Sequence, residues 1–85
     1  MKIFADKTRD VVKKIPQGSV MTYKEVATRA GNPNAARAVA NIMAANHDPE
    51  VPCHRVIRTD GSLGGYNRGG TEKKRAILLS EGVKL

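Results

Sequence analysis

Two short segments of helical character, joined by a turn that contains a glycine, constrain the fold of this chain most strongly. Thr22 and Glu25 have the spacing of a capping box, in which the threonine hydroxyl accepts from the glutamate amide and the glutamate carboxylate accepts from the threonine amide. This pattern predicts a helix over about 23–30. The helix is expected to end at Gly31, where a left-handed backbone conformation costs little.

Asn34 is expected to cap a second helix over about 35–45, whose alanines favour helix and allow another backbone to come close. The two helices are typical of a helix-turn-helix, and a helical hairpin used only for packing is the alternative. No acidic residue lies between Arg29 and His47, so the second helix can approach phosphates without repulsion. Its small side chains offer few groups that read base edges.

The rest of the chain predicts a mainly α fold. Apolar stripes indicate helices over about 5–14 and 72–81, the second capped by Thr71 and ended by Gly82. A short strand is expected over 56–58. At 85 residues, we expect one small domain over 1–85, with a winged helix-turn-helix-like core and a short β-hairpin or strand near the cysteine loop.

The charge balance favours a polyanionic partner. Fifteen Lys and Arg residues oppose eight Asp and Glu residues, giving a net charge of +7. Charge alone does not distinguish DNA from RNA or an anionic membrane surface, and a merely soluble basic protein is the alternative. No apolar run approaches the roughly 18 residues of a membrane span, and the first residues show no signal peptide. We expect a monomer in the cytoplasm, or in the nucleus of a eukaryote.

Cys53 is the only thiol, and it stands in the run Pro52-Cys53-His54-Arg55. A lone cysteine is usually a buried apolar residue, which is one interpretation here. The basic residues after it favour a thiolate, the reactive form, and the adjacent histidine can accept its proton. One cysteine and two histidines are too few for a closed structural zinc site, so we expect no metal.

Charges at both ends of the last expected helix oppose the helix dipole. Lys73, Lys74 and Arg75 stand at its start and Glu81 at its end, where a carboxylate typically costs about 0.3–1 kcal/mol. Such violations are expected mainly at functional or paired sites. Glu81 either orients His54 by a hydrogen bond or is a solvated surface residue.

Tyr23 and Arg37 are candidate nucleic-acid contacts, because Tyr23 opens the first of the paired helices and Arg37 lies in the first turn of the second. Tyrosine can donate a proton or stack on a base, and arginine can replace a base in the stack or pair with phosphate. A half-buried core tyrosine and a solvated arginine are the alternative interpretation.

In combination, these residues resemble the C-terminal, catalytic domain of the methylated-DNA–protein-cysteine methyltransferases (6-O-methylguanine-DNA methyltransferases). A chain of this length would hold the catalytic domain without the family's usual N-terminal domain, and that short architecture is also typical of alkyltransferase-like proteins. The matching segments run in order over nearly the whole chain: Met21 to Ala27, Ala30 to Pro33, Ala35 to Val39, Asn46, Pro52 to Ile57, Gly64 to Tyr66 and Leu78 to Gly82.

The resemblance implies a role for each residue of the reaction site. Cys53 is the alkyl acceptor, His54 takes its proton through a water, and Glu81 holds His54. Asn46 supports the turn that carries the cysteine. Tyr23 helps to rotate the target nucleotide out of the duplex and donates toward the base.

The resemblance also implies contacts with double-stranded DNA that contains alkylated guanine. The helix from Asn34 enters the minor groove, and Arg37 fills the gap left in the duplex. The residues implied in DNA binding are Tyr23, Lys24, Asn32, Ala36, Arg37 and Thr59. Those implied to border the base pocket are Val56, Tyr66 and Asn67.

The function implied is DNA repair by irreversible, single-turnover transfer of the alkyl group to Cys53, with no cofactor. The nucleotide must leave the stack first, at a cost of a few kcal/mol. The alternative is an alkyltransferase-like lesion sensor that binds alkylated DNA and recruits other repair proteins. Such sensors generally carry tryptophan at the position of Cys53, so this residue favours the enzyme.

Overall fold

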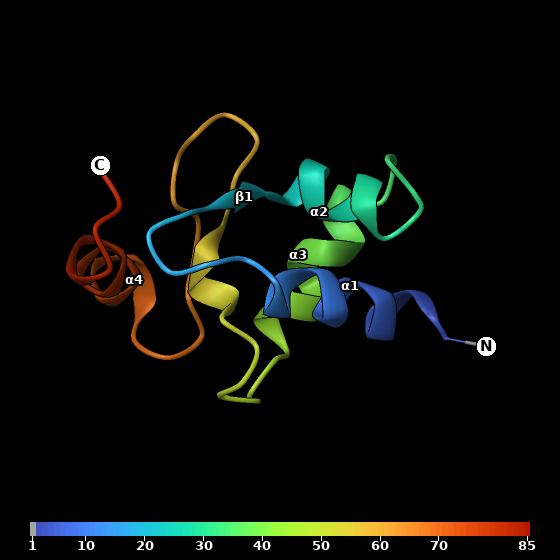
Figure 1. The fold of residues 1–85 in the computed structure, drawn as a ribbon, viewed down its shortest axis with the longest axis horizontal. Coiled ribbons are helices and arrows are strands. Elements are labelled where there is room, and N and C mark those ends of the chain that lie inside the picture. The colour runs from blue at the N-terminus through green and yellow to red at the C-terminus, as the bar shows by residue number, and fades with distance from the viewer. Residues whose placement is uncertain (1) are drawn as a thin grey trace.

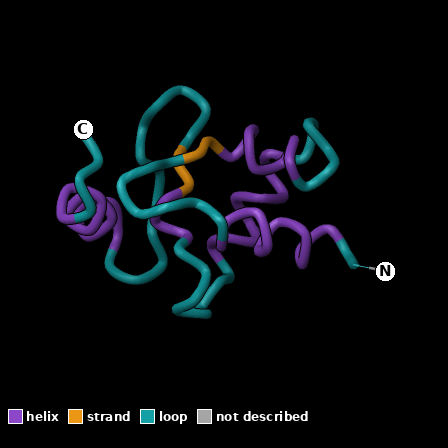
Figure 2. Tube along the Cα trace, viewed as in Figure 1, coloured by secondary structure: helices purple, strands orange, loops and turns teal. Residues whose placement is uncertain are grey.

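The structure is a computed structural model that describes residues 2–85, and it is mainly helical, as the sequence predicts (Figures 1 and 2). Helices α1, α2 and α3 lie together, and α4 lies at the opposite end of the molecule beyond several loops (Figure 1). Within the described residues the elements are α1 (Phe4–Lys13), β1 (Met21–Thr22), α2 (Tyr23–Arg29), α3 (Ala36–Ala44), the 3-10 turn η1 (Cys53–Arg55), β2 (Val56–Ile57) and α4 (Gly70–Ser80).

The predicted helix pair is present as α2 and α3, which pack against each other and against α1. The capping box is confirmed, since the Glu25 amide donates to the Thr22 hydroxyl and the Thr22 amide donates to the Glu25 carboxylate, both at 3.1 Å. Gly31 follows α2 with a φ of 103°, as the sequence predicts. The core between the three helices includes Val12, Val26, Ala27, Val39 and Met43.

Two predicted helix caps are wrong. Asn34 does not cap α3, because the helix begins one residue later and its N-cap position falls on Ala35, which has no capping side chain. The backbone amide of Asn34 donates to the Asn32 side chain at 3.1 Å. Thr71 does not cap α4, which already begins at Gly70. The Thr71 hydroxyl donates to the Gly64 carbonyl at 2.9 Å, so it stabilises the glycine-rich loop rather than the helix end.

The strand predicted over 56–58 is present as β2, and its partner is β1. The two strands pair in parallel, with Met21 opposite Val56 and Thr22 opposite Ile57, so the pair is not a hairpin. A parallel pair needs a long connection, and here that connection contains α2, α3 and the loop before Cys53. The pair therefore brings the start of the helix-turn-helix next to the cysteine turn.

Helix α4 ends where the sequence predicts, and its end is fixed by a second apolar cluster. Gly82 has a φ of 93°, and the Val83 amide donates to the Leu78 carbonyl at 3.0 Å, as in a Schellman motif. Leu78, Val83 and Leu63 are buried together. Glu81 is consequently held at the last turn of the helix. No helix within residues 2–85 is long and apolar enough to cross a membrane.

Candidate active site

A cavity of about 310 Å³ opens beside Cys53. Its lining comes from the start of α2, the end of α3, the cysteine turn and the glycine-rich loop. The side chain of Cys53 is buried, with the residue only 5% exposed. The lining residues are Tyr23, Met43, Ala44, Cys53, Gly65, Tyr66 and Asn67.

The turn that carries Cys53 is held by backbone and amide hydrogen bonds. The Cys53 amide donates to the Val51 carbonyl at 2.8 Å, and the buried Asn46 side chain donates to the same carbonyl at 3.3 Å. Asn67 donates to the carbonyls of Asn46 at 2.6 Å and Ala44 at 2.9 Å. Asn46 and Asn67 therefore connect the end of α3 to both the cysteine turn and the glycine-rich loop.

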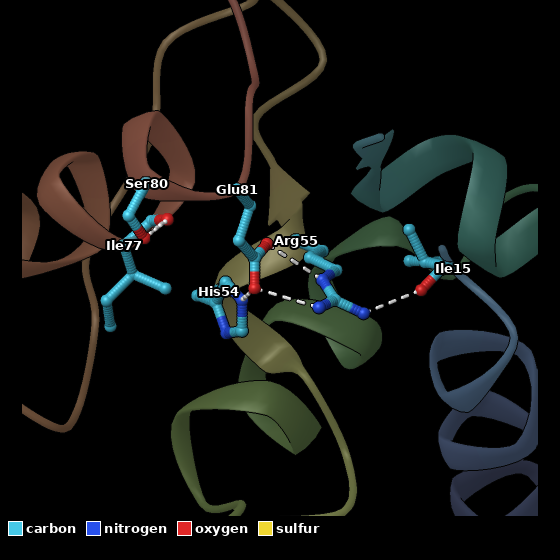
Figure 3. A network of polar contacts seen from close by, with 6 residues as sticks. All are labelled: Ile15, His54, Arg55, Ile77, Ser80 and Glu81. Carbon is cyan, nitrogen blue, oxygen red and sulfur yellow. Dashed lines mark hydrogen bonds and ion pairs between the residues drawn. The ribbon is translucent and has the colours of Figure 1, made fainter. Parts of the chain in front are cut away.

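His54, Arg55 and Glu81 form one polar network at the end of α4 (Figure 3). His54 Nε2 lies 3.0 Å from Glu81 Oε2. Arg55 donates from Nε and Nη2 to the two carboxylate oxygens at 2.9 and 2.8 Å, a bidentate pair, and from Nη1 to the Ile15 carbonyl at 2.8 Å. The structure thus brings Glu81 to His54, and it adds Arg55, which the sequence analysis treated only as a nearby positive charge.

The network keeps Glu81 ionised. Hydrogen bonds from Arg55 lower the pKa of the Glu81 carboxyl, with a further contribution from His54, and the same pairing raises the pKa of Arg55. The ionised carboxylate of Glu81 accepts a hydrogen bond from the protonated Nε2 of His54. The other ring nitrogen, Nδ1, is then the basic one, so the carboxylate selects the tautomer.

Tyr23 and Tyr66 are half-buried at the cavity, and burial raises the pKa of each phenol. Both phenols therefore keep their protons at neutral pH and can donate hydrogen bonds into the cavity. The Tyr66 ring also meets the His54 ring edge-on, with centroids 6.3 Å apart.

Lys74 is a buried residue near this site that the sequence analysis did not select. It is 1% exposed, and its ammonium donates to the carbonyl of Val56 at 2.7 Å and of Gly65 at 3.3 Å. Val56, expected at the base pocket, does not belong to the cavity lining, and its carbonyl is the acceptor for Lys74. The available signal was helical spacing, because Lys74 lies one turn before the buried Leu78.

The other residues implied in DNA contact lie on α2, α3 and the loops beside them. Lys24 and Thr59 are exposed and line a shared surface depression. Arg37 is exposed in the first turn of α3, next to the half-buried Ala36. Asn32 is exposed in the turn between the helices, where its side chain accepts from the Asn34 amide. Only Tyr23 of this set lines the cavity.

In the described part of the chain, the groups near the cavity are not arranged as metal ligands. Residues 2–85 contain no group of three or more His, Cys, Asp or Glu side chains placed to hold a metal ion. The nucleophilic and basic groups near the cavity are instead a thiol, an imidazole oriented by a carboxylate, and two phenols. This set is suited to nucleophilic displacement with proton transfer.

Comparison with protein families matches residues 3–83 to the DNA-binding domain of 6-O-methylguanine DNA methyltransferase. A methylated-DNA–protein-cysteine methyltransferase of Methanothermobacter thermautotrophicus is 52% identical over 77 residues, which cover 89% of this chain and 42% of the relative. The human protein of the same description is 42% identical over 76 residues, covering 88% of this chain and 36% of the relative. The chain thus spans less than half the length of these relatives.

Solved structures agree with the sequence relatives. The Mycobacterium tuberculosis protein OGT in complex with DNA is 40% identical, with a TM-score of 0.86 over 95% of this chain and 49% of that one. Atl1 of S. pombe, in complex with damaged DNA containing O6-carboxymethylguanine, is 35% identical. Its TM-score is also 0.86, over 99% of this chain and 82% of that one.

Proposed function

Because the chain belongs to the family of the 6-O-methylguanine DNA methyltransferases, we propose that it removes an alkyl group from the O6 oxygen of guanine in DNA and keeps it on Cys53. The observation that carries this proposal is the position of Cys53. Its thiol lies in a cavity with Tyr23, and the next residue, His54, is oriented by an ionised Glu81. These are the groups that a displacement reaction needs: a nucleophile, a base and a proton donor.

The reaction begins with proton transfer from the Cys53 thiol to His54, by way of a water. The thiolate then attacks the alkyl carbon, a new S–C bond forms, and the bond from that carbon to O6 breaks. The electron pair of the broken bond goes to the guanine, which accepts a hydrogen bond and then a proton from Tyr23. This leaves a proton in excess on His54 and one missing on Tyr23, and transfer of that proton through solvent restores both side chains. The proton lost by Cys53 then balances the one gained by guanine, so no cofactor or oxidant is needed.

Irreversibility follows from the product. S-alkylcysteine is a thioether, which has no easy route of hydrolysis, and the thiolate is not regenerated. Each protein molecule therefore reacts once, and the alkyl group remains on the protein.

The base must reach the cavity from the duplex. A cavity of about 310 Å³ is at the small end of ligand sites and suits one rotated base rather than a stacked pair. Tyr23 lines it at the start of α2, and the exposed Arg37 lies in the first turn of α3. We propose that α3 enters the minor groove, Arg37 fills the space of the rotated nucleotide, and Lys24 and Thr59 contact the DNA backbone.

The charge of the chain supports this mode of binding. A net charge of +7 favours a phosphate backbone, and the acid-free stretch of the helix-turn-helix gives α3 an approach without repulsion. The binding expected from such contacts depends little on base sequence and weakens as salt increases.

Intact-protein mass spectrometry tests the proposal. After incubation with excess duplex that contains 6-O-methylguanine, the protein should gain one methyl group in place of one hydrogen, and Cys53→Ala should gain nothing. No gain at any excess of DNA would refute alkyl transfer.

A lesion sensor is the second candidate, and the likeness to Atl1 in complex with damaged DNA favours it. A sensor would bind the methylated duplex more tightly than the unmodified duplex while Cys53 stays unmodified. Equal affinity for both duplexes, with no mass gain, would leave only a general helix-turn-helix binder. Electrophoretic mobility measurements beside the mass experiment separate these three outcomes.

A further inference from the structure

Resting on the proposed alkyl transfer, we propose that Lys74 is a positioning residue of the same site. Its buried ammonium fixes two backbone segments around the cavity and supplies the positive charge that favours the thiolate of Cys53. None of the residue roles implied by the sequence includes Lys74.

The geometry gives Lys74 two anchors. Its Nζ donates to the Val56 carbonyl at 2.7 Å and to the Gly65 carbonyl at 3.3 Å, and the residue is 1% exposed. Val56 directly follows the turn that carries Cys53, while Gly65 lines the cavity from the glycine-rich loop. One side chain of α4 therefore holds together two segments that shape the space around the thiol.

The charge of Lys74 has no carboxylate partner. Both of its acceptors are main-chain carbonyls, and none of the ion pairs within residues 2–85 includes it. Arg55, by contrast, is bound to Glu81 through both carboxylate oxygens, so its charge is already compensated. Unlike Arg55, Lys74 therefore has no carboxylate among the described residues that compensates its charge.

Three groups face this ammonium from the elements packed around it. The ring of Tyr23 on α2 lies with its centroid 5.9 Å from Nζ, and Arg58, after β2, disfavours the charged form. Burial is the largest influence and lowers the pKa of Lys74 to about 8, while Cys53 acts in the opposite direction by favouring the ammonium. At neutral pH Lys74 is thus mainly a cation, and Cys53 is the neighbour that favours this charge.

The coupling matters because the thiolate is the nucleophile. Two opposite charges in a poorly solvated part of the protein interact more strongly than in water, and linkage requires that each favours the other. Loss of the Lys74 charge should therefore lower the fraction of Cys53 that is ionised at neutral pH, on the order of tenfold for one pH unit of displacement.

Alkylation of Cys53 by iodoacetamide, followed by mass spectrometry across a pH series, tests this coupling without DNA. Lys74→Met keeps an unbranched side chain of similar length but removes the charge and the donors. We expect the midpoint of its rate-against-pH curve to move to higher pH, with about a tenfold lower rate at neutral pH. The midpoint is independent of the plateau rate, so a change in access to the thiol does not imitate the effect.

Lys73→Met is the matched control, because Lys73 is the exposed neighbour in the same turn of α4. It should react with the midpoint of the unsubstituted protein. Equal midpoints for Lys74→Met and Lys73→Met would overturn the inference. The methyl-transfer experiment tests the proposed function independently of this coupling. A protein that never gains a methyl group from DNA refutes the proposed function, whatever the iodoacetamide curve shows.

A second measurement needs no substitution of Lys74, in case that variant does not fold. The Lys74 side chain can be titrated by NMR in the unsubstituted protein and in Cys53→Ser. Removing the thiolate should move the Lys74 titration to lower pH. An unchanged titration would show that the two groups are not coupled, and would overturn the proposal.

Discussion

Raising the pH above neutral should increase the free energy of unfolding, because Lys74 is charged at a buried position. Burial lowers its pKa in the folded protein to about 8, against 10.5 for an ordinary lysine. Between these two values the unfolded chain binds a proton that the folded chain has released. Linkage then requires the folded state to become more stable as the pH rises through this window.

The magnitude follows from the difference between the two pKa values. At neutral pH the folded state carries almost the whole cost of the buried charge, about 3 kcal/mol. Integration over the window from about pH 7 to about pH 9.5 returns roughly 2 kcal/mol of this cost. For a small domain, a change of this size is a large part of the total free energy of unfolding.

Urea unfolding followed by far-ultraviolet circular dichroism measures the effect. The experiment uses Cys53→Ser as background, so that thiol ionisation does not contribute, and compares it with the same protein carrying Lys74→Met or Lys73→Met. Because Cys53 raises the pKa of Lys74, its replacement lowers that pKa further, and the background and the Lys73→Met protein should gain at least about 2 kcal/mol over the window relative to Lys74→Met. Parallel curves for all three proteins would refute the reasoning.

Three other predictions concern the rest of the site. Hydrogen bonds from Arg55 lower the pKa of Glu81 in the folded protein, so the ionised carboxylate adds to the free energy of unfolding above its ordinary pKa of 4.5. This contribution is lost as the pH falls through the pKa of Glu81 in the folded protein, and Glu81→Gln should show no such loss in acid unfolding. Arg37→Ala should slow transfer from duplex DNA more than reaction with free alkylguanine, and equal losses in a kinetic assay would contradict its role in base rotation. Gly82→Ala should cost roughly 1–2 kcal/mol in urea unfolding, because alanine is strained at a φ of 93°, whereas Gly65→Ala, without that φ, should cost less.

Local chemistry made much of the fold predictable. The capping box of Thr22 and Glu25, the helix ends at Gly31 and Gly82, and the strand at Val56 each depend on neighbours along the chain, and all are present. The two wrong cap predictions placed the start of a helix at the wrong residue. Helix α3 begins one residue after the position that Asn34 could cap, and α4 begins before Thr71, because the first residue of a helix is not fixed by the spacing of cap residues alone.

Cys53 and His54 could be predicted as candidate site residues because they are adjacent in one short run, Pro52-Cys53-His54-Arg55. The approach of Glu81 to His54 depends on packing between α4 and the cysteine turn, and the sequence offered only an unfavourable charge at a helix end. Arg55 and Lys74 show the limit most clearly. Each is one of fifteen basic residues, and the partners that they find, the Glu81 carboxylate for Arg55 and two main-chain carbonyls for Lys74, follow from tertiary contacts that no local pattern contains.

The parallel pairing of β1 with β2 has a consequence for the order in which the molecule assembles. Its two register pairs join positions 21 and 22 to positions 56 and 57, whereas the α2–α3 hairpin closes through segments that are near along the chain. Contacts between distant positions are expected to form late in folding and to open early in partial unfolding, because closing a long loop costs entropy before the contacts that it allows can stabilise the chain. A chain with its helical hairpin formed but this pair open would already offer a basic surface to DNA, yet its thiol would lie apart from Tyr23. Binding and chemistry would then have different folding thresholds, and mild denaturant should abolish the reaction before it abolishes attachment to the duplex.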